Sequence, residues 1–467
     1  MSDGDTKPEI DPEIFKAYDI RGVYPDDLDE EVAYRIGRGV PRVLSEEAEK
    51  PAGELRVAVG HDMRTSSPEL ADRFAEGIRD EGASVLDIGR VATEMVYFAV
   101  GSEGLDGGLM CTASHNPKEW AGAKIVKQGA IALSGDAGLA EIRDIVTSDD
   151  IGDPAGERGK REERDVGEDF RRAAIAWIDP GQIREMKVVL DGGNGMAGPM
   201  VGPILDDLPI EQVRTYWEPD GEFPDHEPNP MLEENRQFVI DKVCSEGAEL
   251  GIAWDGDADR CFFVDDTGKF VSGDFLTALL AESILEKEPG ATILFDVRAS
   301  RAVPEVIERA GGTGCVNRVG HAYFKTRMRD MGAAFGGEVS GHYYFRDFYN
   351  ADSGTLPALL ILELLSRKEQ KMSELLAPYR EKYFLSGEIN SEVEDKDAKM
   401  QELAERYGEQ GAEIGELDGV SVDFEDWHFN VRPSNTEPLL RLNLESLVSE
   451  EHMEEKRDEV LGLIQEG

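Results

Sequence analysis

The chain has 467 residues, of which 40% are hydrophobic, so it is too apolar to be disordered and long enough for about three or four domains, each with its own core. Asp and Glu number 97 against 50 Lys and Arg, a formal net charge of −47. No cluster of Lys and Arg stands out, and no apolar run approaches the ~20 residues of a membrane span. We therefore expect neither nucleic acid nor a membrane as a partner.

The acidic residues are spread along the whole chain. This pattern favours a halophilic protein, because concentrated salt screens the repulsion between like charges. An acidic mesophilic protein, or one with an acidic disordered tail, is the alternative. Residues 1–10 are polar, with no apolar segment of a signal peptide, so we expect a cytoplasmic location. The four cysteines form no Cys-x-x-Cys pair, which argues against a zinc site, a redox motif or a disulfide framework.

Short apolar runs alternate with helix-like stretches along the chain. The runs are residues 55–60, 107–111, 188–190, 250–254 and 292–295, and each ends in a polar loop, which in all but the second contains Gly or Asp. Helices are expected between them, for example at 68–81 and 275–285. The alternation predicts α/β units with largely parallel sheets, in which the ends of the strands carry the chemistry.

Composition also predicts where the domains divide. The charged stretch 147–168 resembles a linker followed by a helix at 169–178, and Asp-Thr-Gly at 266–268 is a turn signal. A further boundary is expected after a helix at 372–383. The remainder has short alternating strands and helices at 396–407 and 449–464, typical of a smaller α+β module. The predicted domains are therefore 1–160, 161–268, 269–382 and 383–467.

The segment Thr-Ala-Ser-His-Asn-Pro at 112–117 follows a predicted strand. A loop of this kind can present the hydroxyl of Ser114 as a nucleophile, with His115 and Lys124 nearby. The alternative is a helix N-cap, because Ser or Asn before Pro is common where a helix begins.

The segment Asp-Gly-Asp-Ala-Asp-Arg at 255–260 places three carboxylates at alternate positions. Asp255, Asp257 and Asp259 can converge on one hard cation. An EF-hand is excluded, because its sixth and twelfth positions would be Arg260 and Asp266 instead of Gly and Glu. The three carboxylates and Arg260 suit Mg²⁺ in phosphoryl transfer, and the alternative is an acidic loop without a metal.

Two later loops have the composition of ligand-binding loops. Gly-Gly-Glu-Val-Ser-Gly-His at 336–342 is suited to the hydroxyls of a sugar. Arg-Pro-Ser-Asn-Thr-Glu-Pro at 432–438 can surround a phosphate, or it is a turn with a solvated Arg. Tyr-Asp-Ile-Arg-Gly at 18–22 and Gly-His-Asp-Met-Arg-Thr-Ser at 60–66 are predicted to be structured turns that contain an Arg.

Together these motifs resemble the α-D-phosphohexomutase family, the phosphoglucomutases and phosphomannomutases. The resemblance runs nearly end to end, with four motifs in the family's order. It implies an α/β fold of four domains around a central cleft: three related α/β domains with mixed sheets and a smaller C-terminal α+β domain. It also implies an isomerase, an intramolecular phosphotransferase that moves phosphate between C1 and C6 of a hexose. The reaction would pass through a phosphoserine and a hexose 1,6-bisphosphate, in a monomer or homodimer.

The resemblance implies a role for each matching residue. Ser114 would be the phosphoserine and a ligand of Mg²⁺ beside the three aspartates of residues 255–260. The other catalytic residues would be Lys124, Arg260 and His321. The substrate-binding residues would be Tyr18, Arg21, His115, Arg298, Glu338, Ser340, His342, Arg432, Ser434, Asn435 and Thr436.

Some segments indicate the branch, and others depart from the family. Thr-Glu-Met at 93–95 and Tyr-Phe-Arg-Asp-Phe at 344–348 are similar to phosphomannomutases, so mannose is the expected sugar. Phosphoglucomutase or dual activity is the alternative, ahead of a metal-dependent sugar phosphatase or a non-enzymatic cation-binding protein. Ala-Gly precedes Lys124 where the family usually has Asn-Gly. Arg298 replaces the Lys of some members and is a poor proton acceptor, so His321 or Lys124 is the expected base.

Overall fold

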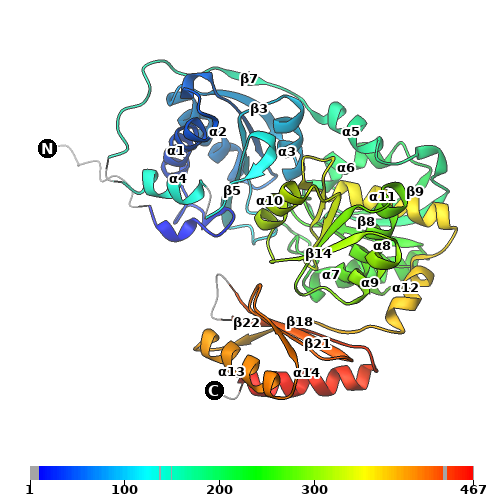
Figure 1. The fold of residues 1–467 in the computed structure, drawn as a ribbon. Coiled ribbons are helices and arrows are strands. Elements are labelled where there is room, and N and C mark those ends of the chain that lie inside the picture. The colour runs from blue at the N-terminus through cyan, green and yellow to red at the C-terminus, as the bar shows by residue number, and fades with distance from the viewer. Residues whose placement is uncertain (1–9, 136–137, 149, 435–438, 466–467) are drawn as a thin grey trace. The chain divides into compact units, whose positions relative to one another are not determined.

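A computed structural model describes residues 10–135, 138–148, 150–434 and 439–465. The chain divides into two compact units, one formed by residues 1–270 and 344–369 and the other by residues 271–343 and 370–467. Figure 1 shows the elements of both. Among the described helices, none combines the length and the apolar character needed to cross a bilayer.

The first unit begins with a mixed sheet whose main path is β1-β5-β4-β2-β3-β7, with β6 paired to β5. Strands β4, β2, β3 and β7 are parallel, and β5 is antiparallel to both β4 and β1. The strands are β1 (Ile20–Val23), β2 (Arg56–His61), β3 (Ser84–Arg90), β4 (Gly107–Cys111), β5 (Trp120–Lys127), β6 (Ile131–Ala132) and β7 (Arg161–Glu163). The accompanying helices are α1 (Glu30–Ala48), α2 (Ser67–Asp80), α3 (Thr93–Ser102) and α4 (Leu139–Val146).

Helices α1 and α2 pack with their backbones in close approach. A Cβ atom at Gly37 would lie 2.3 Å from the carbonyl oxygen of Phe74, and one at Gly77 would lie 2.1 Å from that of Tyr34. Only glycine fits at either position. The apolar faces of both helices join the core of the first sheet, where Ile36, Leu70 and Val57 are fully buried.

A second mixed sheet in the first unit has the order β12-β11-β10-β8-β9. Strand β8 is parallel to β9 and β10, and β11 is antiparallel to β10. The strands are β8 (Met186–Asp191), β9 (Ile210–Thr215), β10 (Leu250–Trp254), β11 (Cys261–Asp265) and β12 (Phe270–Val271). The remaining elements of this unit are α5 (Gly167–Ile175), α6 (Ala197–Leu205), α7 (Glu233–Glu246), the hairpin β16 (Tyr343–Phe345) and β17 (Ala351–Asp352), and α11 (Thr355–Lys368).

The second unit contains a parallel group of strands in the order β14-β13-β15. These are β13 (Thr292–Asp296), β14 (Thr313–Asn317) and β15 (Phe335–Gly337), with helices α8 (Gly273–Lys287), α9 (Ala302–Arg309), α10 (His321–Met331) and α12 (Met372–Arg380). The three strands end near residues 296, 317 and 337, so the loops that follow them lie at one edge.

The end of the chain forms an antiparallel sheet in the order β18-β22-β21-β20-β19. Its strands are β18 (Phe384–Glu392), β19 (Glu413–Gly415), β20 (Val420–Asp423), β21 (Trp427–Pro433) and β22 (Leu439–Ser446). Figure 1 shows helices α13 (Lys396–Glu409) and α14 (Glu450–Gln465) along one face of this sheet. Their apolar residues, including Leu403 and Val460, share a core with Phe429 and Leu442.

The structure confirms the predicted α/β architecture with mixed sheets and a smaller C-terminal α+β module. Residues 107–111 and 250–254 are β4 and β10 as predicted, and the other predicted strands and helices differ only at their ends. The stretch 147–168 was predicted to be a linker, and this is wrong in part. Residues Arg161–Glu163 form β7, which pairs in parallel with β3 through backbone hydrogen bonds that its polar sequence does not indicate.

Candidate active site

Ser114 lies in the loop between the antiparallel strands β4 and β5. Its φ of 53° is in the left-handed region, which residues other than glycine seldom adopt, and its N–H donates to Oγ1 of Thr112 at 2.9 Å. The residue is 3% exposed, and Oγ lies 3.2 Å from Nδ1 of His115. No helix follows Pro117, because the chain turns directly into β5. The alternative of a helix N-cap is therefore wrong.

The three aspartates lie in the loop between β10 and β11. Asp255, Asp257 and Asp259 are each at most 1% exposed, and one oxygen from each lies within 4.8 Å of the others. Ala258 has a φ of 58°, so the backbone turns sharply within this loop. The turn brings the three alternate carboxylates to one point, as the sequence predicted.

The serine loop and the aspartate loop meet inside the first unit. Oγ of Ser114 donates to Oδ2 of Asp255 at 3.2 Å, across 141 positions of sequence. The two backbones also lie close together, because a Cβ atom at Gly256 would be 2.6 Å from the carbonyl oxygen of Ser114. Glycine at 256 is therefore required for the serine hydroxyl to reach the carboxylates.

Two buried cations accompany the carboxylates. Nζ of Lys124 donates to Oδ2 of Asp257 at 2.7 Å and to Oδ2 of Asp259 at 2.5 Å, while Nε of Arg260 donates to Oδ2 of Asp255 at 2.8 Å. Burial acts to lower the pKa of Lys124, but the two aspartates outweigh it and hold that pKa above its ordinary value. Burial likewise acts to raise the pKa of Asp257, and Lys124 holds it below its ordinary value. Both side chains are therefore charged at neutral pH.

The aspartate loop has the donor set of a hard divalent cation. All of its side-chain donors are oxygens, and soft sulfur or nitrogen ligands are absent from residues 255–259. Within the described part of the chain, Oδ1 of Asp257 is buried and accepts no hydrogen bond. A buried carboxylate oxygen without a partner is costly, and a cation would satisfy it. The residues present therefore fit Mg²⁺.

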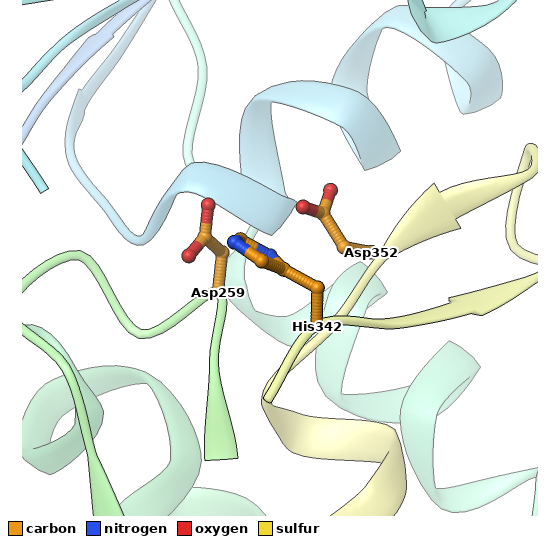
Figure 2. Close-up of side chains that lie close together, drawn as sticks. All are labelled: Asp259, His342 and Asp352. Atoms are coloured by element: carbon orange, nitrogen blue, oxygen red, sulfur yellow. The ribbon is translucent and has the colours of Figure 1, made fainter. Parts of the chain in front are cut away.

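A further carboxylate lies beside the aspartate loop. Figure 2 shows Asp259 together with Asp352 of strand β17, and their carboxylate oxygens come within 4.8 Å of each other. Both belong to the first unit and both are buried. The sequence analysis did not include Asp352, because a single Asp in the segment Asn-Ala-Asp-Ser carries no recognisable spacing. Figure 2 also labels His342, which belongs to the second unit.

Sequence reasoning also missed the contact between Thr93 and the aspartate loop. Thr93 is the first residue of α3, its hydroxyl donates to Oδ2 of Asp257, and its N–H donates to the carbonyl of Asp257 at 3.1 Å. The segment 93–95 was used only as a mark of the phosphomannomutase branch. The contact spans 164 positions, so no local pattern could reveal it.

The N-terminal motif lies next to the serine loop. Nε of Arg21 donates to Oδ2 of Asp19 at 2.8 Å, and Nη1 donates to the side-chain oxygen of Asn116. Tyr18 is half-buried just before β1, and Arg21 and Gly22 lie in that strand instead of in the predicted turn. The structure thus places Arg21 in contact with the loop that carries Ser114.

The predicted sugar-binding loop of the second unit follows β15. The N–H of Glu338 donates to the carbonyl of His342 at 2.9 Å, and Oε1 of Glu338 accepts the N–H of Gly320 at 2.7 Å. The rings of His321 and His342 have centroids 6.0 Å apart. Ser340 is half-buried in this loop. The structure therefore brings together His321 and the loop 338–342, which the sequence placed in separate motifs.

An arginine cluster of the second unit lies next to the predicted sugar-binding loop, because Asp296, which binds Arg298, also accepts the N–H of Val339 at 2.9 Å. Arg298 binds Asp296 through Nε–Oδ1 at 3.0 Å and Nη2–Oδ2 at 2.8 Å. Glu388 of β18 lies 3.2 Å from Arg298, 3.4 Å from Arg432 and 3.2 Å from Arg441. Burial acts to lower the pKa of Arg298, but Asp296 and Glu388 raise it above its ordinary value. Arg298 is therefore permanently charged.

The predicted phosphate loop is described only in part. The N–H of Ser434 donates to the carbonyl of Leu439 at 2.8 Å, and the carbonyl of Ser434 accepts Nζ of Lys396 at 3.1 Å. Asn435 and Thr436, which the sequence assigned to the same loop, lie outside the described residues.

Comparison with known proteins covers nearly the whole chain. The phosphoglucomutase/phosphomannomutase models for alpha/beta/alpha domains I, II and III match residues 12–152, 170–268 and 272–383, and the model for the C-terminal domain matches 388–463. A protein of Xanthomonas campestris described as "Phosphohexose mutases" is 42% identical over 452 residues, covering 96% of this chain and 98% of its own. The "Phosphomannomutase" of Escherichia coli K12 is 39% identical, with coverage of 97% and 99%.

The solved structures agree. A phosphoglucomutase/phosphomannomutase family protein from Burkholderia thailandensis superposes with a TM-score of 0.88 at 33% identity, over 98% of this chain and 99% of its own. In sequence, the four family models span the serine loop, the aspartate loop and both predicted ligand-binding loops. The chain therefore belongs to the phosphoglucomutase/phosphomannomutase family, the α-D-phosphohexomutases, and is an isomerase of the intramolecular phosphotransferase type.

Proposed function

We propose that this phosphohexomutase interconverts mannose 1-phosphate and mannose 6-phosphate through phosphorylated Ser114 and the 1,6-bisphosphate. The observation that carries the proposal is the contact of Ser114 Oγ with Asp255 Oδ2 at 3.2 Å, beside the buried charges of Lys124 and Arg260. The curated relatives from Escherichia coli and Vibrio cholerae, both described as "Phosphomannomutase", support mannose as the sugar.

The proposed chemistry follows from the family resemblance. The bond between phosphorus and Ser114 Oγ breaks, and a bond to the free sugar hydroxyl forms. Of the two expected bases, His321 would take the hydroxyl proton, because Asp257 and Asp259 hold the pKa of Lys124 above its ordinary value and keep it protonated. The resulting bisphosphate reverses its orientation in the site and returns its other phosphoryl group to Ser114. Arg298 is excluded as the base. Its guanidinium donates two hydrogen bonds to Asp296 and stays protonated, so it has no free position to accept a proton.

Mg²⁺ would be held by Ser114 and the three aspartates, and it would neutralise the charge of the phosphoryl group in transfer. Lys124 and Arg260 supply further positive charge from the protein itself. In the second unit, Glu338, Ser340 and His342 would bind sugar hydroxyls. Arg432, Ser434, Asn435 and Thr436 would bind the phosphate that does not react, and Tyr18, Arg21, His115 and Arg298 would complete the substrate contacts.

The remaining features of the proposal follow from composition and from the resemblance. The domains are 1–160, 161–268, 269–382 and 383–467, close to the four matched segments. The enzyme acts in a cytoplasm, as a monomer or homodimer, on small sugar phosphates and not on nucleic acid or membranes. The high negative charge further supports a salt-rich cytoplasm.

The phosphoserine is tested by intact mass and peptide mapping after incubation with glucose 1,6-bisphosphate and Mg²⁺. We expect one phosphate on Ser114, and loss of both phosphate and activity in Ser114→Ala. The exposed Ser245 provides a matched control, because Ser245→Ala should retain both. Activity without phosphate on Ser114 would contradict the mechanism.

The sugar is tested by kcat/KM on mannose 1-phosphate and glucose 1-phosphate side by side. A clear preference for mannose supports the proposal, whereas equal values identify a dual phosphomannomutase/phosphoglucomutase. Inorganic phosphate is measured in the same reactions. Its net release in place of the isomer would identify a phosphatase. EDTA should abolish turnover, and Mg²⁺ should restore it.

A further inference from the structure

One buried arginine in the first unit has no part in the chemistry above. Arg64 lies in the turn between β2 and α2, and its side chain is fully buried, as is that of Asp62, whose Oδ2 lies 3.3 Å from Nε. Removing a guanidinium from water is costly unless its donors are satisfied. Asp62 satisfies only part of the hydrogen-bonding capacity of the Arg64 guanidinium. The remaining donors must therefore have other partners.

Those partners are four backbone carbonyls, three in the serine loop and one at Trp120, the first residue of β5. Nη2 donates to the carbonyl of Ser114 at 2.9 Å and to that of Asn116 at 2.6 Å. Nη1 donates to the carbonyl of Pro117 at 2.7 Å and to that of Trp120 at 3.2 Å. One planar group thus fixes the loop on both sides of His115, from the nucleophile to the first residue of β5.

The conformation of Ser114 makes this contact significant. Its left-handed backbone is strained and persists only where the surroundings fix it. Arg64 binds the carbonyl of this very residue, and the close approach of Gly256 leaves that carbonyl little room to move. Turning the Ser114 peptide to an ordinary β conformation would break the contact with Arg64.

A separate segment covers the arginine from the other side. The guanidinium carbon of Arg64 lies 5.2 Å from the centre of the Phe223 ring, a cation–π distance. A Cβ atom at Gly221 would lie 2.7 Å from the backbone of Met63 and Thr65, so the two segments are in tight contact. Phe223 therefore keeps water away from the Arg64 hydrogen bonds.

We propose that Arg64 is a positioning residue for phosphoryl transfer, holding the serine loop in the one conformation that directs Ser114 Oγ at Asp255. Arg64 touches neither substrate nor reacting atoms and acts through the backbone of the loop. The inference rests on the proposed role of Ser114. Lysine keeps the positive charge but cannot donate to four carbonyls in one plane, so Arg64→Lys separates geometry from charge.

The experiment measures how fast Ser114 gains phosphate from glucose 1,6-bisphosphate, by rapid quench and intact mass, in the full-length enzyme with Mg²⁺. We expect Arg64→Lys to lose roughly a hundredfold in this rate, as misplacement of a reacting group by about 1 Å does, with KM unchanged. The matched control is Arg38→Lys. Arg38 is also buried and binds Glu81 and the carbonyl of Gly152, away from the serine loop, and its variant should transfer phosphate at the wild-type rate.

Transfer by Arg64→Lys at the wild-type rate, or an equal loss in Arg38→Lys, would overturn the inference. Amide hydrogen exchange provides a readout that does not depend on phosphorylation: residues 112–120 should exchange faster in Arg64→Lys than in wild type, and unchanged exchange would also overturn it. Wild-type enzyme that gains no phosphate on Ser114 would instead contradict the proposed function. If Arg64→Lys does not fold, Phe223→Leu is measured in its place. We expect the phosphoryl-transfer rate of this variant to fall several-fold, and an unchanged rate would overturn the inference.

Discussion

Thr93 donates its side-chain hydroxyl to Oδ2 of Asp257, and its backbone N–H donates to the carbonyl of the same aspartate. The first residue of helix α3 thereby fixes both the backbone and the carboxylate of a proposed metal ligand. Lys124 binds the same Oδ2 at 2.7 Å, which leaves Oδ1 directed elsewhere. Groups that orient a ligand in this way affect metal affinity without touching the metal.

We therefore expect Thr93→Val to weaken Mg²⁺ binding by about tenfold to a hundredfold, because valine keeps the shape and loses the hydroxyl. Titration calorimetry with Mg²⁺ measures the affinity directly, and the Mg²⁺ dependence of kcat measures it in turnover. Thr277→Val is the matched control: Thr277 is buried, and among the described residues its hydroxyl makes no hydrogen bond. Equal Mg²⁺ affinity in Thr93→Val and wild type would show that the contact does not orient Asp257.

Arg298 tests the assignment of the base. Lysine at this position loses the bidentate contact with Asp296. Unlike the guanidinium, its amine can be deprotonated and could then act as a base. We expect Arg298→Lys to raise KM more than it lowers kcat, because the arginine binds and does not accept protons. His321→Ala and Lys124→Ala, measured in parallel, should lower kcat. A kcat that rises about tenfold in Arg298→Lys while the other two variants are mild would assign proton transfer to position 298.

The residues in these predictions show what the sequence could and could not indicate. Strands β4 and β10 were predicted to the residue, because each is a continuous apolar run that ends at a polar loop. Strand β7 was missed, because Arg-Glu-Glu at 161–163 consists of charged residues and has no apolar alternation. Its pairing depends on backbone groups of β3, which carry no sequence signal.

The site shows the same division. The aspartate loop and the serine loop were each predicted because, within each loop, the side chains that carry the chemistry lie close together in sequence. Arg64 was seen only as an arginine in a turn, because all but one of its partners are backbone carbonyls, which any sequence would supply. Thr93 and Asp352 were missed because their contacts join distant segments. Side-chain patterns therefore predict the reacting groups, and tertiary structure is needed for the groups that hold them.

Glu94 gives a prediction for pH. This side chain is fully buried and accepts hydrogen bonds from the hydroxyls of Ser353 and Thr355. Burial raises the pKa of Glu94 from 4.5 to about 8, although both hydrogen bonds favour the charged form. Between these two pH values, Glu94 is therefore protonated in the folded state and ionised in the unfolded state. Its contribution to stability is complete below about pH 4.5 and is lost as the pH rises through about 8.

We expect Glu94→Gln, which is neutral at every pH, to remove this dependence. Between about pH 5 and about pH 8, the free energy of unfolding of wild type should fall relative to the variant by up to about 1.4 kcal/mol per pH unit. Urea unfolding across the range measures it. Glu69→Gln, at an exposed glutamate of α2, controls for the loss of one carboxylate. Parallel pH profiles in wild type and Glu94→Gln would show that Glu94 binds no extra proton in the folded state.

The last prediction concerns salt. The net charge of −47 is distributed along the chain, and helix α14 shows its local effect. Acidic residues recur there at spacings of four, so like charges face each other on one exposed surface: Glu450, Glu454 and Asp458, and Glu451, Glu455 and Glu459. Such pairs destabilise a helix by about 0.2–0.5 kcal/mol each. Lys456 forms an ion pair with Glu459, and Arg457 forms one with Asp458, which offsets part of this repulsion.

Salt should relieve this repulsion, because the Debye length falls from about 10 Å at 0.1 M to about 3 Å at 1 M. We expect the Tm to rise along a KCl series at fixed Mg²⁺, with activity following stability. Glu454→Lys converts two repulsive pairs of α14 into attractive ones, so it should raise the Tm in dilute buffer and lose that advantage in molar KCl. Sucrose, which stabilises by exclusion from the surface and does not screen charge, controls for effects of cosolute alone. A Tm that stays flat or falls as KCl increases would show that the acidity is not an adaptation to high salt.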